Sequence, residues 1–275
     1  MSFLPQFDTA IPPELGQVIQ WLARLRSQEG VEAAREAAVM LSRRFSQVDL
    51  LDELAQWHEA NWWRPLNFGA IRLERRRPEH FEFVWSLVVD QDFSYRLKNI
   101  PADLTPRDLL EILTHDYTAL LPETRSIQWV VFHGQTPIGL SMFVNINFHN
   151  RSAEQIMGIL PAYMRSFLVA DAYCASLSFA YNSLGMHKVQ GVIYESNVQV
   201  ALLQERFGFR REGHLRSTVW SDARQASEDV VQIALLDEEF DRNRVLQRYI
   251  SRQARDPFLG VRRLWPRQPL KVPRE

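Results

Sequence analysis

Cysteine is almost absent from this 275-residue sequence, which contains only Cys174. A single cysteine excludes an internal disulfide framework and is typical of proteins in a reducing compartment. No apolar run reaches the length of a membrane-spanning helix, and the N-terminus lacks the basic-then-apolar pattern of a signal peptide. We therefore expect a cytoplasmic protein that has no membrane partner.

A strong excess of charge is also missing, because the formal net charge is -1 at pH 7. Such a balance gives no global attraction to nucleic acid or to anionic membranes. Basic residues gather only locally, at Arg75-Arg76-Arg77 and at Arg262-Arg263, and clusters of this size are most often solvated surface. The seven histidines are scattered without the spacing of a Cys/His metal site, so we expect no metal.

Hydrophobic residues make up 46% of the sequence, which is enough to form the core of a globular protein of this length. Apolar stripes at helical spacing, such as Leu15/Leu22, predict a helical N-terminal extension over residues 1–68. We expect this extension to cover the main domain, residues 69–240, and an independent partner-binding module is the alternative. Residues 241–275 are expected to form a C-terminal helix and a basic Arg/Pro-rich tail.

Residues 183–216 are the most informative stretch and predict a strand, a helix and a second strand. The segment KVQGVIY at 188–194 is β-rich. Asn197 is a good helix N-cap, and Gly208 stands where a C′ glycine ends a helix. We expect 188–194 and 210–220 to be neighbouring strands of one sheet.

The same stretch carries four motifs in a characteristic order. They are Leu184-Gly185-Met186-His187-Lys188-Val189, then Asn197, then Leu203 with Gly208-Phe209, and last Glu212-Gly213 with Arg216. In order and spacing they resemble the C-terminal half of a GNAT-superfamily N-acyltransferase. The likeness is to the branch that acetylates ribosomal-protein N-termini, polyamines and amino sugars. It covers about residues 70–240 and implies an α/β (α+β) GNAT fold, with a mixed central β-sheet flanked by helices.

The upstream residues fit the same fold. The pattern predicts a first strand at 71–74, helices from Pro78 and from Thr105-Pro106, a hairpin of 127–132 with 138–146, a central strand from 150 to Ile159, and a long buried helix at 165–184. By the resemblance, the central strand separates from its neighbour after Ile159.

The resemblance also implies the reaction, which is acyl transfer from a thioester to an amine. That chemistry needs a general base for the amine and hydrogen-bond donors for the developing oxyanion. Glu154 on the central strand is the first candidate for the base, although a carboxylate there forms a surface ion pair equally well. The backbone N–H near Ile159 is the expected oxyanion donor, and the helix-capping Asn197 completes the catalytic candidates.

The acceptor is expected to meet the end of the preceding strand. Its candidate binding residues are Asn145, Asn147 and His149, for which a merely polar strand end is the alternative.

The loop expected to hold the donor's pyrophosphate departs from the family pattern Arg/Gln-x-x-Gly-x-Gly/Ala, whose glycines let the backbone approach the phosphates. Met164 stands in place of the arginine or glutamine, and Phe167 and Val169 replace both glycines. Arg165 comes one position late and still offers a guanidinium for a phosphate. The candidates for donor binding are Leu160, Arg165, Ser166 and Phe167.

A second departure concerns the acid that protonates the leaving thiolate. The family commonly places a serine three residues after the capping asparagine, or a tyrosine seven residues after it. The corresponding residues here are Val200 and Gln204, and neither side chain is an acid. The two departures together predict weak binding of acetyl-CoA.

We therefore expect an enzyme, an N-acyltransferase that forms an amide between an acyl group from acyl-CoA or another thioester and a small-molecule or peptide amine. One alternative is an aminoacyl-tRNA-dependent amide-forming transferase in a biosynthetic pathway, with tRNA as a partner. A second alternative is a catalytically silent GNAT-fold binding protein. The sequence leaves the oligomeric state open.

Overall fold

The computed structural model describes residues 65–97, 103–118, 125–147, 149–164, 166–221 and 225–254, together with isolated helical residues between Trp21 and Ala37. Residues 65–117 and 124–269 form one compact unit, and residues 1–64 belong with 118–123 and 270–275 to another. Most of the predicted N-terminal extension and the basic tail lie outside the described residues. The division into three segments therefore remains a prediction.

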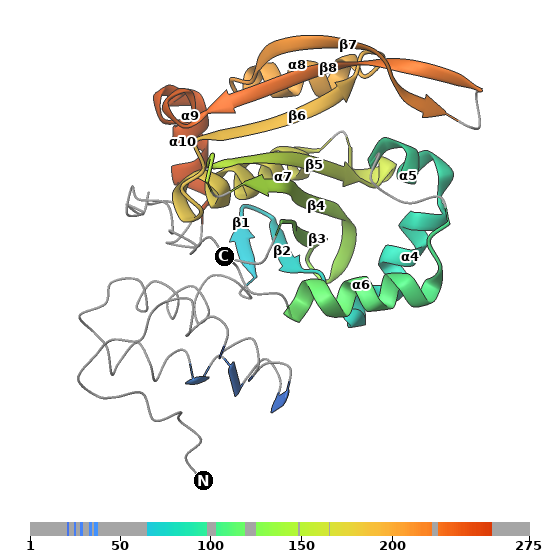
Figure 1. Cartoon of the computed structure of the whole chain (residues 1–275). Coiled ribbons are helices and arrows are strands. Elements are labelled where there is room, and N and C mark those ends of the chain that lie inside the picture. Colours follow the sequence, from blue (N-terminus) through green and yellow to red (C-terminus); the bar gives the residue numbers. More distant parts are fainter. Residues whose placement is uncertain are drawn as a thin grey trace. The chain divides into compact units, whose positions relative to one another are not determined.

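Eight strands within the described ranges form one mixed sheet (Figure 1). They are β1 (Leu66–Phe68), β2 (Ile71–Arg75), β3 (Ile127–His133), β4 (Thr136–Asn147), β5 (Ser152–Ile159), β6 (Lys188–Tyr194), β7 (Arg210–Ser221) and β8 (Ala226–Leu236). Their order across the sheet is β1-β2-β3-β4-β5-β6-β8-β7. Only the β5–β6 pair among them is parallel.

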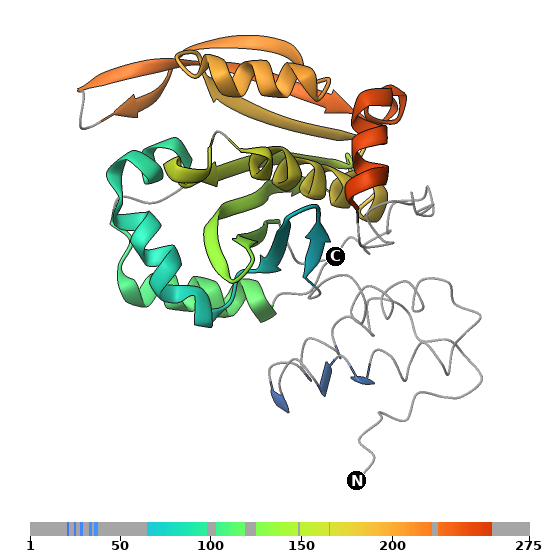
Figure 2. The ribbon, with the colours of Figure 1, turned by 180° about the vertical axis from the view of Figure 1, so that it is seen from behind.

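Helices cover both faces of this sheet. They are α4 (Phe81–Val89), α5 (Gln91–Leu97), α6 (Pro106–Thr118), α7 (Phe167–Ser178), α8 (Val198–Arg206), α9 (Asp237–Arg242) and α10 (Arg244–Gln253), with short turns η2 (Pro78–His80) and η4 (Pro161–Tyr163) and the π-helical η5 (Phe179–Ser183). Helices α7 and α8 face the viewer in Figure 2, where the sheet is seen from behind. None of the described helices is long and apolar enough to cross a membrane.

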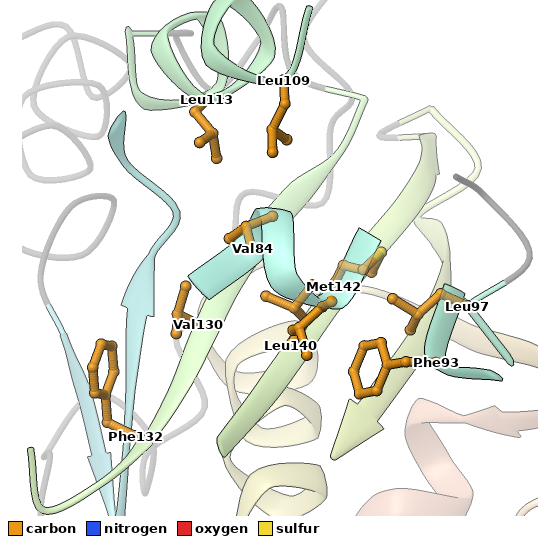
Figure 3. Close-up of a cluster of buried hydrophobic side chains, with 10 residues drawn as sticks. Val84, Phe93, Leu97, Leu109, Leu113, Val130, Phe132, Leu140 and Met142 are labelled. Carbon is orange, nitrogen blue, oxygen red and sulfur yellow. The ribbon is translucent and has the colours of Figure 1, made fainter. Parts of the chain in front are cut away.

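One core cluster fixes α4, α5 and α6 to the sheet (Figure 3). Its buried members are Val84, Leu87, Phe93, Leu97, Leu109 and Leu113 from these helices, and Val130, Phe132, Leu140 and Met142 from β3 and β4. Apolar side chains that converge in this way supply most of the favourable free energy of folding. The cluster therefore holds α5 beside the end of β5.

The predicted buried helix is confirmed as α7 and its continuation η5. From Asp171 to Leu184 every residue is buried, because α7 packs on β1, β2 and β4 on one side and against α10 on another. Asp171 is the charged residue in this stretch. Its carboxylate accepts hydrogen bonds from the Ala70 N–H at 3.0 Å and from the Tyr249 hydroxyl at 2.5 Å. Those two bonds tie the β1–β2 turn and α10 to α7.

The expected pairing of 188–194 with 210–220 is wrong. Both strands belong to the sheet, but β8 lies between them and pairs with β6 on one edge and with β7 on the other. The chain leaves β6 through α8 and returns parallel to β6 but one strand further away. The β7–β8 hairpin then fills the gap. Strand periodicity specifies which residues face the core, but it does not specify which strand occupies an edge.

The expected position of the strand separation is also wrong. β5 pairs with β6 only from Ser152 to Glu154, opposite Lys188 to Gln190, so the separation begins after Glu154 rather than after Ile159. Beyond that point β5 continues to pair with β4, while β6 pairs with β8 along its whole length. Because each half-sheet follows its own twist, the two diverge towards the ends of β5 and β6 (Figure 1).

Candidate active site

The divergence of β5 and β6 opens a cavity of about 230 Å³. Its walls come from the second half of β5, from β6, α7 and α8, and from Phe93 of α5. The side chains that matter below are Glu154, Val169, Tyr173, Asn197, Val200 and Gln204. The cavity lies outside the carboxyl ends of two parallel strands, which is where ligands bind in open α/β sheets.

Side chains from both faces of the sheet line the cavity. Successive side chains of a strand point to opposite faces. Ile156 packs against the α4–α5–α6 cluster, whereas the Gln155 amide donates a hydrogen bond of 2.5 Å to Ser176 of α7. Glu154 has the same parity as Ile156, so it approaches the cavity from the α5 face. Tyr173 of α7 approaches it from the opposite face.

Glu154 carries the only charge among the cavity-lining residues that the structure describes. Its carboxylate accepts a hydrogen bond of 3.0 Å from the Asn145 amide. Asn145 lies in an irregular part of β4, where pairing with β5 shifts between Val144 and Asn147, and its φ is 52°. Asparagine tolerates this left-handed conformation better than most residues. The structure thus joins the predicted base to one of the three predicted acceptor-binding residues.

The other two predicted acceptor-binding residues lie beyond that contact. The Asn147 side chain accepts a hydrogen bond of 2.8 Å from the Asn150 N–H, which stabilises the turn into β5. His149 is exposed in the same turn. Both residues therefore have a place in the turn, and their role in acceptor binding stays a prediction.

The backbone N–H groups of Ile159 and Leu160 point to opposite sides of β5. The Leu160 N–H donates to the Ile138 carbonyl of the β4 side at 2.8 Å. Because N–H groups alternate along a strand, the Ile159 N–H points the other way, towards the half-sheet of β6. β5 has no pairing with β6 at this level. Ile159 is thus placed to donate into the cavity, whereas the Leu160 N–H is already used in the sheet.

The N-terminus of α7 forms one end of the site. Its N-cap residue Ser166 donates its hydroxyl to the Tyr163 carbonyl at 2.6 Å and makes no side-chain cap. N–H groups of an uncapped first turn favour a bound anion. The Phe167 side chain is 82% exposed and points to solvent, whereas Val169 lines the cavity. Arg165 lies outside the described residues, so its role stays a prediction.

On α8, Asn197 caps the helix as the sequence indicates, accepting from the Val200 N–H at 3.4 Å. Gln204 is buried, with 5% of its surface exposed, and its Oε1 atom has no hydrogen-bond partner among the described residues. Asn197, Val200 and Gln204 all line the cavity. The described α8 face of the site therefore carries both polar and apolar side chains, and none of them is an acid.

Sequence reasoning missed Tyr173. This residue is 7% exposed and lines the cavity, and its ring lies 5.7 Å from that of Phe207 at the end of α8. Burial raises the pKa of its hydroxyl to about 12, and a hydrogen bond with the Gln204 side chain opposes part of that rise. A signal was available, because Tyr173 follows Val169 by four residues and so shares its helix face.

A second cluster of titratable groups lies away from the cavity. Glu195, His214 and Asp229 bring possible ligand atoms within 4.8 Å of one another. The His214 Nε2 atom is 3.2 Å from Asp229 and 3.5 Å from Glu195, and the Asp229 carboxylate also accepts from the Ser217 N–H. These contacts link the end of β6 to β7 and β8.

Comparisons with known proteins agree on one family and one fold. A family model described as "Acetyltransferase (GNAT) domain" matches residues 70–210, just over half of the chain. The uncharacterized N-acetyltransferase YoaA of Bacillus subtilis (strain 168) is 25% identical over 119 residues, which is 42% of this chain and 67% of YoaA.

Solved structures of spermidine N-acetyltransferase from Vibrio cholerae have the same fold. The complex with CoA and spermine matches with a TM-score of 0.56 at 20% identity, covering 63% of this chain and 99% of that one. A dodecameric form in an intermediate state gives a TM-score of 0.55 at 22% identity, covering 64% and 98%. At such identities the likeness concerns the fold alone.

Proposed function

The chain belongs to the GNAT acetyltransferase family and is therefore an acyltransferase, and we propose that it transfers an acyl group from acyl-CoA to a small-molecule or peptide amine. The observation that carries this proposal is the cavity between β5 and β6, into which Glu154 and Tyr173 project from opposite faces. A donor and an acceptor that enter from opposite faces would meet at the separated strands.

The described residues fit an acyl-CoA donor, which when bound supplies its acyl group as a thioester. The N-terminus of α7, which has no side-chain cap, would hold the pyrophosphate, since the first turn of a helix and its dipole favour negative charge. Phe167 leaves this end open because its side chain lies in solvent. Of the two residues that replace the family glycines, only Val169 lines the cavity.

Two groups of this chain would act on the reacting atoms, and a third would position one of them. The Glu154 carboxylate would accept a proton from the amine, and the Asn145 amide would orient that carboxylate through its hydrogen bond. The Ile159 N–H would stabilise negative charge on the carbonyl oxygen as the amine adds. Each of these groups lies on β4 or β5, so the sheet fixes their positions relative to one another.

The acceptor is proposed to be a small amine, which is what the names of the structural neighbours support. The V. cholerae relatives are spermidine N-acetyltransferases. An amine that is protonated in water would be attracted to the cavity by Glu154, the sole charge on its described walls. Neither the family model nor these relatives supports an aminoacyl-tRNA donor or a biosynthetic pathway.

The test is amine-dependent release of CoA from acetyl-CoA by the full chain. Spermidine, spermine, glucosamine and a dipeptide with a free N-terminus would be offered singly, with CoA and the acetylated amine quantified by chromatography. We expect release with at least one amine, and a fall of roughly 10²–10⁴-fold for Glu154→Gln, the range over which general bases contribute. Asp108→Asn, an exposed carboxylate on α6, is the matched control. A folded protein that acetylates none of these amines would contradict the proposal.

A further inference from the structure

We propose that Tyr173 is the catalytic acid that protonates the departing thiolate, so that α7 supplies the proton donor that α8 lacks. This inference rests on the proposed acyl-CoA-dependent reaction. The residues that carry it are Tyr173, Gln204 and Tyr194, all on the wall of the cavity.

An acid is needed because the C–S bond breaks inside a partly enclosed site. Burial disfavours the charged form of any group, and a thiolate released among Val169, Val200 and Leu203 would be poorly solvated. Supplying a proton as the bond breaks avoids that charge. A thioester held along the N-terminal turns of α7 would place its sulfur on the face from which Tyr173 enters.

Few groups on the described walls can give that proton. Glu154 lies on the opposite face, where it would serve the amine. Tyr194 donates its hydroxyl to the Tyr95 carbonyl at 2.8 Å and stacks on the Tyr95 ring, so its proton is committed to the fold. Val200 has no ionisable proton, and the amide of Gln204 is far too weak an acid. Tyr173 remains.

Gln204 and Phe207 hold the Tyr173 ring for this purpose. The hydrogen bond with Gln204 lowers the pKa of Tyr173, as a donor to the phenol oxygen does. The oxygen therefore accepts from the Gln204 N–H, and its own proton stays available for the sulfur. The ring of Phe207, 5.7 Å away, fixes the tilt of the Tyr173 ring. Gln204 thus acts as a positioning residue at the place where an acid was expected.

Burial also limits the difference between the pKa of the Tyr173 phenol and that of the departing thiol. With its pKa near 12, the Tyr173 phenol is protonated at neutral pH. The same desolvation acts on a thiol in this site, as it does on Cys174 of the same helix, whose pKa burial raises. The pKa values of the phenol and of the thiol therefore rise together, and the transfer from oxygen to sulfur is not opposed by the full difference seen in water.

The step conserves atoms and electrons. The amine nitrogen forms a C–N bond with the acyl carbon while its surplus proton passes to Glu154. The C–S bond then breaks, the electron pair leaves with sulfur, and sulfur takes the proton of Tyr173. Exchange with water removes the proton from Glu154 and restores that of Tyr173. The net products are the amide and the free thiol.

The experiment compares Tyr173→Phe with wild type in the full chain, and uses Tyr181→Phe as the matched control. Tyr181 is also buried, on the continuation η5 of the same helix, but its hydroxyl donates to the Leu235 carbonyl at 2.6 Å and the residue does not line the cavity. We expect Tyr173→Phe to lower kcat by roughly 10²-fold while KM for acetyl-CoA changes less than about threefold. Tyr181→Phe should retain the kcat of wild type.

A leaving-group comparison separates acid catalysis from a structural role. The acetyl thioester of 4-nitrothiophenol releases a thiol that is far more acidic than that of CoA and needs no proton. The Tyr173→Phe defect should shrink to within about threefold with this thioester, because only the contribution of the general acid is lost. A defect of equal size with both thioesters, an unchanged kcat, or a loss confined to KM would overturn the inference while leaving the proposed function intact. A wild-type protein that transfers no acetyl group would instead overturn both.

Discussion

At the scale of single residues, the donor loop shows how burial changes the meaning of a substitution. In the sequence, Phe167 and Val169 look alike, because each places a large side chain where the family has glycine. In the structure they differ, because Phe167 is 82% exposed whereas Val169 lines the cavity. The expected weak binding of acetyl-CoA therefore depends on Val169, and on Met164 where the family has an arginine or glutamine.

This difference gives a paired prediction. Val169→Gly should tighten acetyl-CoA binding by about 3- to 10-fold, because it gives the ligand access to bare backbone. Phe167→Gly should change the Kd by less than about twofold, since its side chain lies in solvent. Isothermal titration with both variants measures this, and equal effects would show that the cavity does not hold the donor. The new glycines destabilise α7 by up to about 1 kcal/mol each, which denaturation would report separately.

The site illustrates which candidate residues a sequence can reveal. Asn197 was accessible because it belongs to a local pattern, a helix cap, and Glu154 was a candidate because the resemblance placed it on the central strand. The link of Glu154 to Asn145 joins residues on two strands, and only the register of β4 and β5 brings them together. Tyr173 lies on a helix whose composition indicated burial alone. The role proposed for Tyr173 depends on Gln204, which lies 31 positions later in the sequence. No local pattern connects these two residues.

At the scale of elements, local signals were sufficient for the helices and strands and insufficient for their arrangement. The N-cap Asn197 and Gly208, whose φ is 94°, mark the ends of α8 as the sequence indicates. The hairpin of β3 and β4 and the buried α7 are likewise confirmed. The insertion of β8 and the early separation of β5 from β6 arise from long-range pairing and sheet twist, which short patterns do not encode.

Helix α5 packs closely against β5 because Gly158 has no side chain. A Cβ atom at Gly158 would lie 2.8 Å from Phe93 and 2.9 Å from Leu97, both on α5. A Cβ at Gly139 would instead meet the Gly158 carbonyl oxygen at 2.2 Å, where backbone rather than side chains must move. Both glycines therefore set how closely elements pack around the cavity.

We predict that Gly158→Ala costs about 1–3 kcal/mol of the free energy of unfolding, and that Gly139→Ala costs more. Chemical denaturation of both variants measures this. Gly134→Ala is the control, because a Cβ there meets nothing within 4 Å and only its φ of 61° is unfavourable. Gly158→Ala should also raise KM for the amine, since Phe93 lines the cavity. A Gly158→Ala variant as stable as wild type would refute the packing argument.

At the scale of the whole molecule, the N-terminal segment is predicted to be a helical cover. The stripes Leu15/Leu22 and Leu50/Leu54 are expected to be buried within the chain. A truncation should begin at Pro65, because Leu66 and Phe68 of β1 are buried and pair with β2. Residues 65–275 should then expose apolar surface and aggregate, which light scattering would detect. A monodisperse truncation with the melting temperature of the full chain would show that the segment is an independent module.

The central claim is that acyl-CoA binds between β5 and β6 with its pyrophosphate at α7. Hydrogen exchange of the full chain with and without acetyl-CoA tests it most directly, because backbone N–H groups that bind a ligand exchange more slowly. The account predicts added protection in residues 155–159 and in the first turn of α7, and none in the β7–β8 hairpin. If neither residues 155–159 nor the first turn of α7 gained protection at saturating acetyl-CoA, the result would contradict the central claim.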